Sequence, residues 1–188
     1  MQRGASLVEL MVGLVMLGIV IAIAVPGLHT WLQNAQIRAT AEAVLNGVQM
    51  ARGEAVRRNS MAKFSLTGTS GMADWSVSAY DTGNGLFDLA VQSWSSGQAK
   101  NARVGTSSVA TQDYSVALAA GAGVPASVSF NALGRVVNVG TDITRIDVMD
   151  ATSSGARRLV IIISPYGFAR LCDPTLANTN PESCTYTG

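Results

Sequence analysis

The chain has 188 residues, enough for one globular domain and an additional element but too few for two domains of ordinary size. Lys and Arg number 13 against 12 Asp and Glu, so the chain lacks the overall basic charge that attracts nucleic acid nonspecifically. A nucleic-acid function would need a local basic patch. Charged residues make up 13% of the chain, which favours a secreted or surface-assembled domain over a cytosolic enzyme.

A long uncharged segment lies near the beginning of the chain. No charged residue occurs between Leu10 and Leu28, and a helix of that length spans roughly 28 Å, close to the thickness of the hydrocarbon core of a bilayer. Residues 5–28 are therefore predicted to form a membrane-spanning helix. Glu9 stands at its edge, where a charged side chain is costly and usually marks a function.

Two simpler interpretations of this segment are open at this point. A secretory signal peptide would use Ala22-Ile23-Ala24 as a small-x-small cleavage site, but it would not carry Glu9 beside its apolar region, and the helical pattern continues past the site. A plain single-span anchor fits the length of the segment and leaves Glu9 unexplained.

The second half of the predicted helix is amphipathic. Apolar residues recur at steps of three and four over residues 37–55, and polar residues occupy the other faces. Arg57-Arg58 suits the negative end of a helix dipole, and Asn59-Ser60 is typical of a helix stop. Residues 29–60 are therefore expected to bury one face, and Pro26 is the predicted break between the two halves.

After residue 60 the apolar residues alternate, or run together over short stretches, between clusters of Gly, Ser, Thr, Asn and Pro. This pattern predicts a mostly antiparallel sheet. The predicted strands lie in KFSLTG, DWSVSAYD, LFDLAVQSW, DYSVALA, ASVSFN, GRVVNV, TRIDVMD and RRLVIIIS. Residues 131–134 predict a hairpin loop, and residues 95–108 are assigned to a surface loop. The expected fold class is α+β, with the helix covering the sheet of a head formed by residues 61–188.

The two cysteines lie close together near the end of the chain. Cys172 and Cys184 enclose a polar loop with two prolines, and an even pair of cysteines in an exported protein most simply forms a disulfide. Closing a loop of this size contributes roughly 3 kcal/mol in the chain-entropy model. A metal site would need two further ligands, and the one histidine, His29, is far away in sequence. No metal and no cofactor are predicted.

The sequence does not indicate an enzyme. Around His29 no Ser-His-Asp or Cys-His arrangement can be assembled without long-range guesses, and no phosphate-binding glycine motif is present. No catalytic residue is therefore assigned.

The N-terminal residues resemble the signal segment of type IV pilins and type II secretion pseudopilins. Gly4 precedes Ala5-Ser6-Leu7-Val8-Glu9-Leu10 and an apolar helix with Pro26, which matches the family's glycine before the cleavage site, its glutamate fifth in the mature chain and its proline twenty-second. The resemblance implies that residues 1–4 form a leader, that a prepilin peptidase cuts between Gly4 and Ala5, and that the new amino group of Ala5 is methylated. The family usually has phenylalanine at that position.

The resemblance also implies a role for Glu9. In the family, the glutamate pairs with the terminal amine of an adjacent subunit and so sets the register of helices in a filament. Opposite charges in a medium of low dielectric offset part of their desolvation when they are close and well aligned. The alternative is that Glu9 simply lies among the lipid headgroups.

Further motifs resemble the GspH/FimT/FimU group of minor pilins and pseudopilins: VQMARGEAVRRNS, VSFNALGRV and RRLVIIISPYGFARLC. The group implies the pilin fold, a long N-terminal helix packed on a β-rich head. It also implies a minor pilin that is incorporated into a type IV pilus or primes its assembly, first as a single-pass inner-membrane protein with its head in the periplasm and then at the cell surface. The implied partners are major and minor pilins, the prepilin peptidase, the inner-membrane assembly platform and, before assembly, membrane lipid. A minor pseudopilin of a type II secretion system is the alternative.

A DNA-binding competence pilin is the third hypothesis, and it is not favoured. Some FimT-type pilins bind DNA through glycine-arginine-any-arginine after the last strand, and in Gly167-Phe168-Ala169-Arg170 the first of those arginines is replaced by Phe168. Arg157 and Arg158 lie nearby, but from Arg145 onward four acidic residues balance four basic ones. Phosphate binding depends on clustered cations. The possible DNA contacts are Arg157, Arg158 and Arg170.

Overall fold

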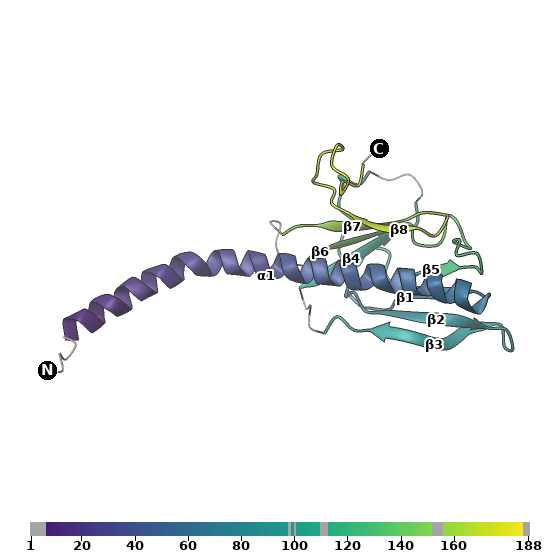
Figure 1. Cartoon of the computed structure of the whole chain (residues 1–188), viewed down its shortest axis with the longest axis horizontal. Coiled ribbons are helices and arrows are strands. Elements are labelled where there is room, and N and C mark those ends of the chain that lie inside the picture. The colour runs from purple at the N-terminus through teal and green to yellow at the C-terminus, as the bar shows by residue number, and fades with distance from the viewer. Residues whose placement is uncertain (1–6, 98, 100, 110–112, 152–155, 186–188) are drawn as a thin grey trace.

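The computed structural model describes residues 7–97, 99, 101–109, 113–151 and 156–185. Within these ranges the chain forms one long helix, α1 (Leu7–Arg58), followed by a head of short strands, and Figure 1 shows half of the helix projecting from that head. The strands are β1 (Ala62–Leu66), β2 (Trp75–Asp81), β3 (Leu86–Trp94), β4 (Ala102–Ser107), β5 (Ala126–Phe130), β6 (Arg145–Asp150), β7 (Leu159–Ile163) and β8 (Ala169–Cys172).

The helix α1 is continuous, so the break predicted at Pro26 is not present. A proline removes one backbone donor, and the neighbouring hydrogen bonds can carry a helix across it, with bending; Figure 1 shows a smooth curve.

The predicted end of the helix is confirmed. The amide of Asn59 donates to the carbonyl of Val56, the amide of Ser60 donates to that of Ala55, and Asn59 has a left-handed φ of 50°. This pairing is a Schellman motif, which satisfies carbonyls at the end of the helix.

The head contains two antiparallel sheets, where the sequence predicted one. Their strand orders are β3-β2-β1-β5 and β4-β6-β7-β8. The C-terminal half of α1 contacts strands of both sheets, so a single helix face closes the core against each of them. The predicted strands that became β1, β2, β3, β5, β6 and β7 are confirmed, while β4 and β8 were not predicted. The fold class, α+β with a long helix on antiparallel sheets, is confirmed.

The buried face of α1 is the face that its periodicity predicted. Six of its residues have exposed fractions of 0–1%: Ile37, Ala41, Val44, Val48, Ala51 and Ala55. Gly47 lies beside them, and an ideal Cβ at this position would be 2.8 Å from Cε2 of Phe64 and 3.0 Å from the Trp75 ring. The two rings pack with centroids 5.8 Å apart. Gly47 therefore lets the helix backbone approach this aromatic pair closely.

Two predicted strands are wrong. DYSVALA, residues 113–119, is irregular because its backbone carbonyls accept hydrogen bonds from arginine side chains instead of a neighbouring strand. GRVVNV, residues 134–139, makes a single bridge, between Phe130 and Val136. The chain turns soon afterwards, since the side chain of Asp142 accepts from the amide of Asn138 and closes a tight loop. The predicted hairpin loop is present as a turn in which the Gly134 amide donates to the Asn131 carbonyl.

The strand β4 lies in a segment that the sequence assigned to a surface loop. Its small and polar residues are typical of a loop, yet Val104 is fully buried and Gly105 faces the following segment. An ideal Cβ on Gly105 would be 2.6 Å from the carbonyl oxygen of Ala119. Close passage of another backbone over the strand therefore accounts for the glycine that weakened the strand pattern.

Candidate functional site

Among the residues that the structure describes, the N-terminal half of α1 projects away from the head (Figure 1). The side chains of residues 7–22 and 27–32 are exposed, and this part of the helix is long and apolar enough to cross a membrane. Its large side chains, such as Leu7 and Val8, are 74% and 66% exposed. A helix that is apolar on every side needs an apolar environment, either lipid or other apolar helices.

Glu9 lies in the first turn of this exposed helix. The N-terminal end of a helix dipole favours a negative charge, so the position suits a carboxylate electrostatically. Leu10, Gly13, Leu14 and Leu17 line an open depression beside it. The predicted cleavage residues Gly4 and Ala5 fall outside the described residues.

Three segments that are distant in sequence meet at the C-terminal end of α1. Nε of Arg52 donates to the carbonyl oxygen of Gly134 at 3.2 Å, and Cζ of the same arginine lies 4.7 Å from the centroid of the Phe168 ring. The turns at Gly134 and Gly167 touch, because an ideal Cβ on Gly167 would be 1.8 Å from the Gly134 oxygen. These segments belong to the three motifs of the second resemblance, residues 48–60, 128–136 and 157–172.

The two turns form for local reasons. Oδ1 of Asn131 accepts from the amides of Leu133 and Arg135 at 3.0 and 3.1 Å, which is the Asx arrangement that asparagine favours in turns. In the second turn the Gly167 amide donates to the carbonyl of Ser164 at 2.8 Å. Gly134 and Gly167 have φ of 71° and 81°, values at which a Cβ is strained.

Arg157 and Arg158, two of the possible DNA contacts, each pair with a buried carboxylate of the head. Nε of Arg157 lies 2.6 Å from Oδ2 of Asp173, and Nη1 of Arg158 lies 2.6 Å from Oδ2 of Asp147. Burial alone would raise the pKa of Asp173, but hydrogen bonds from Thr175 and from Arg157 lower the pKa overall. A guanidinium with an internal carboxylate partner has less charge to offer a phosphate.

Arg170, the third possible DNA contact, supports the disulfide loop. Its Nη1 and Nη2 donate to the carbonyl oxygens of Ser183 and Cys184 at 3.1 and 3.0 Å. The predicted disulfide between Cys172 and Cys184 is present, and both cysteines are buried with Val160. The arginine and the disulfide therefore fix the same loop, which favours a structural role for Arg170.

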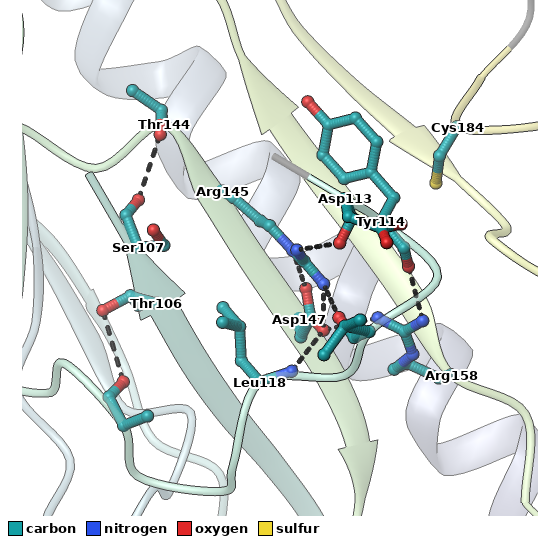
Figure 2. Close-up of polar contacts among 12 residues, drawn as sticks. Thr106, Ser107, Asp113, Tyr114, Leu118, Thr144, Arg145, Asp147, Arg158 and Cys184 are labelled. Carbon is teal, nitrogen blue, oxygen red and sulfur yellow. Dashed lines mark hydrogen bonds and ion pairs between the residues drawn. The ribbon is translucent and has the colours of Figure 1, made fainter. Parts of the chain in front are cut away.

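A buried charge cluster in the second sheet, shown in Figure 2, was not predicted from the sequence. Nε of Arg145 lies 2.6 Å from Oδ1 of Asp147, and Nη1 of Arg158 reaches the other carboxylate oxygen. The side chains of Asp147 and Arg145 are 0% and 3% exposed. The spacing of Arg145 and Asp147, two residues apart on one strand, could have shown that they share a face. Arg158 comes from the neighbouring strand segment.

The cluster holds the loop of residues 113–118 against the sheet. Arg145 donates to the carbonyls of Asp113 and Val116 at 3.0 and 2.6 Å. Arg158 donates to two more carbonyls of the loop, and Asp147 accepts from a loop amide at 3.1 Å. Five backbone groups that would otherwise need a strand partner are satisfied in this way, so the cluster replaces a sheet ladder.

Acid is expected to destabilise the end of α1 through Glu54. A hydrogen bond from Arg57, assisted by Arg58, lowers the pKa of Glu54 from 4.5 to about 2, although burial opposes the change. Because the folded pKa is below the unfolded one, the stabilisation is present above pH 4.5 and is lost as the pH falls toward 2. We expect about 1–2 kcal/mol, reduced from the full shift because Arg57 is exposed to solvent.

The measurement is the free energy of unfolding of the protein and of Glu54→Gln between pH 6 and pH 2 in urea. The difference between the two curves should shrink as the pH falls, since glutamine cannot titrate. Curves that stay parallel over this range would contradict the expected linkage.

The fold is similar to those of solved protein structures. It is similar to the type IV minor pilin FimU of Pseudomonas aeruginosa, with a TM-score of 0.53, 17% identity and coverage of 82% of this chain and 98% of the FimU chain in the crystal structure. It is also similar to the minor pseudopilin EpsH of the Vibrio cholerae type 2 secretion system, with a TM-score of 0.50, 8% identity and coverage of 75% of this chain and 99% of the EpsH chain in that structure. No curated protein matches the sequence significantly.

The match to a protein family covers more of the chain than any single motif does. Residues 40–167 match the family described as type II transport protein GspH, and this range runs from the buried half of α1 to the turn at Gly167. It includes the contact of Arg52 with Gly134 and the strands β1 to β7 of the head. With the exposed apolar helix and the minor pilin and pseudopilin fold, this match shows that the chain belongs to the GspH family.

Proposed function

We propose that the chain is a minor pilin, a structural subunit without catalytic activity that is built into a type IV pilus or primes its assembly. The observation that carries the proposal is the exposed apolar half of α1 with Glu9 in its first turn. In the membrane this half is surrounded by lipid, with the head in the periplasm. In the filament it packs against the helices of other pilins, and the pilus carries the head to the cell surface.

Processing precedes assembly in this proposal. A prepilin peptidase cuts between Gly4 and Ala5, and the new amine of Ala5 is methylated. The free amino end then lies close enough to the Glu9 carboxylate of an adjacent subunit for the two charges to set the helical register. The inner-membrane assembly platform transfers the processed chain from lipid to the filament.

A minor pseudopilin of a type II secretion system is the second candidate, and the match to the GspH family and the similarity to EpsH fit it as well. A deletion strain separates the two. Loss of surface pili with normal secretion supports the pilus, and loss of secretion with normal pili supports the pseudopilus. DNA uptake is not proposed, because each of the three arginines considered for it has an acceptor within the head.

Glu9→Ala is expected to reduce incorporation into sheared pili by roughly tenfold while leaving membrane insertion intact. The loss of about 1.4 kcal/mol of charge attraction corresponds to a tenfold change in an equilibrium. The measurement is the amount of the full-length chain in the sheared pilus fraction relative to the membrane fraction. Glu42→Ala is the matched control, because Glu42 is also an exposed glutamate of α1 and its partner Arg38 is 3.0 Å away on the surface. Normal incorporation of Glu9→Ala would contradict the role of Glu9.

A further inference from the structure

Four large apolar side chains are exposed around the C-terminal end of α1. Val56 is 52% exposed, Leu133 75%, Tyr166 64% and Phe168 65%. They come from the helix and from the two touching turns, and we call them the apex patch. An ideal Cβ on Gly134 would be 3.3 Å from Cγ2 of Val56, so the helix and the first turn are in direct contact. Exposed apolar residues gathered in this way usually mark an interaction surface.

Several contacts join the parts of the apex patch. The Cζ of Arg52 lies over the Phe168 ring at 4.7 Å, and that of Arg135 lies over the Tyr166 ring at 5.8 Å. The amide of Val136 donates to the carbonyl of Pro165 at 3.1 Å and ties the two turns together. Aromatic residues and arginines supply most of the binding energy at protein interfaces, and rigid presentation lowers the entropy lost on binding.

An open groove runs along one side of the apex patch. Its volume is about 610 Å³. The groove is lined by Gln49, Arg52, Gly53, Val56, Arg57, Gly167, Phe168 and Ala169. Gly53 and Gly167 are among these lining residues, and a side chain of a partner could enter between the helix and the second turn. The surface is therefore a set of apolar projections next to a recess.

The charge around the apex patch is positive. Arg52, Arg57, Arg58 and Arg135 lie on the end of α1 and on the first turn, and Glu54, which pairs with Arg57 and Arg58, is the carboxylate among them. An occupant that combines apolar side chains with carboxylates would satisfy both features. DNA fits less well, because Arg57 and Arg58 already share Glu54 and the patch presents four apolar side chains.

The position of the patch excludes the bilayer as its occupant. Figure 1 shows the C-terminal end of α1 at the end of the head farthest from the N-terminal half of the helix. If residues 5–28 span the membrane, a helix rising 1.5 Å per residue places Val56 roughly 40 Å beyond the hydrocarbon.

We propose that the apex patch docks another subunit of the same filament through a face that combines apolar side chains with carboxylates. This inference rests on the proposed function. The helix supplies the interface shared by every subunit, and the apex patch selects the neighbour whose acidic face matches Arg52 and Arg135. Selection by charge at this end of the head would fix where in the filament the chain is placed.

The test uses the full-length chain in its own cells, with a photo-crosslinking amino acid in place of Leu133 or Tyr166. Leu86 is the control position, since it is 59% exposed on β3 and lies outside the patch. After shearing, the expected result is a crosslink from the patch positions to another pilus subunit with an acidic face, and none to that subunit from position 86. A crosslink to nucleic acid, or no crosslink in pili that contain the chain, overturns the inference. Absence of the chain from pili overturns the proposed function and the inference together.

A charge reversal tests the chemistry of the patch. Arg135→Glu is expected to lower the yield of the Leu133 crosslink about tenfold, and a matching acidic-to-basic change on the identified partner should restore it. Arg38→Glu is the control, because Arg38 is an exposed arginine of the helix outside the patch. Equal crosslink yields in the two variants would overturn the electrostatic part of the inference, provided that thermal unfolding shows both to be folded.

Discussion

Replacing Asp147 by asparagine is expected to lower the free energy of unfolding by about 3–5 kcal/mol, because removal of one partner leaves buried charge uncompensated. Asp147 is fully buried between Arg145 and Arg158, and its carboxylate accepts from both guanidinium groups. Asparagine keeps the shape of the side chain and removes its charge. It also places an amide donor opposite two cationic donors, so at least one hydrogen bond in the cluster is lost.

The measurement is urea unfolding of the full-length protein in detergent, followed by the fluorescence of the head tryptophans. Glu42→Gln is the control, because it breaks the exposed ion pair with Arg38 and should cost no more than about 0.5 kcal/mol. The loss of about 3–5 kcal/mol expected for the change at Asp147 is a large fraction of the roughly 5–15 kcal/mol that stabilises a typical domain. If the two variants lose the same stability, the cluster does not hold the loop of residues 113–118.

Periodicity predicted the parts of the fold that depend on local pattern. The buried face of α1 follows from apolar residues at three- and four-residue steps, and Phe64 and Val77 follow from alternation within their strands. DYSVALA alternates as well as these strands do, but its backbone pairs with Arg145 and Arg158, which come tens of residues later. No local sequence pattern shows that arginine side chains take the place of a neighbouring strand. The second sheet was missed for a related reason, since β4 carries the small residues of a loop.

The candidate site was predictable in part. The disulfide was predicted because two thiols lie close together near the end of the chain, and it is present. Glu9 was singled out because a charge beside apolar residues is costly, and its role stays a prediction. The meeting of Arg52 with Gly134 and Gly167 depends on how two sheets pack on one helix, and the sequence does not contain that geometry. The motifs indicated a family, and the structure supplied the contact between them.

Gly167→Ala is expected to destabilise the protein by about 2–5 kcal/mol, from left-handed strain of about 1–2 kcal/mol and a steric conflict of about 1–3 kcal/mol. Gly167 has φ of 81°, and the Cβ of alanine would be 1.8 Å from the carbonyl oxygen of Gly134. That oxygen belongs to the backbone and also accepts from Arg52, so it cannot move away without breaking the contact between the two turns. The turns should separate, and the apex patch should lose its shape.

Gly140→Ala separates the conformational strain from the steric conflict. The measurement is urea unfolding of both variants. Gly140 also has a positive φ, 100°, but its Cβ would meet nothing within 4 Å, so alanine there carries the conformational strain alone. The extra loss in Gly167→Ala is then the cost of pushing the two turns apart. Crosslinking from Leu133 should fall with Gly167→Ala and remain with Gly140→Ala, because only the first change disturbs the surface that we propose for docking. Equal losses of stability in both variants would mean that the close approach of the turns contributes nothing.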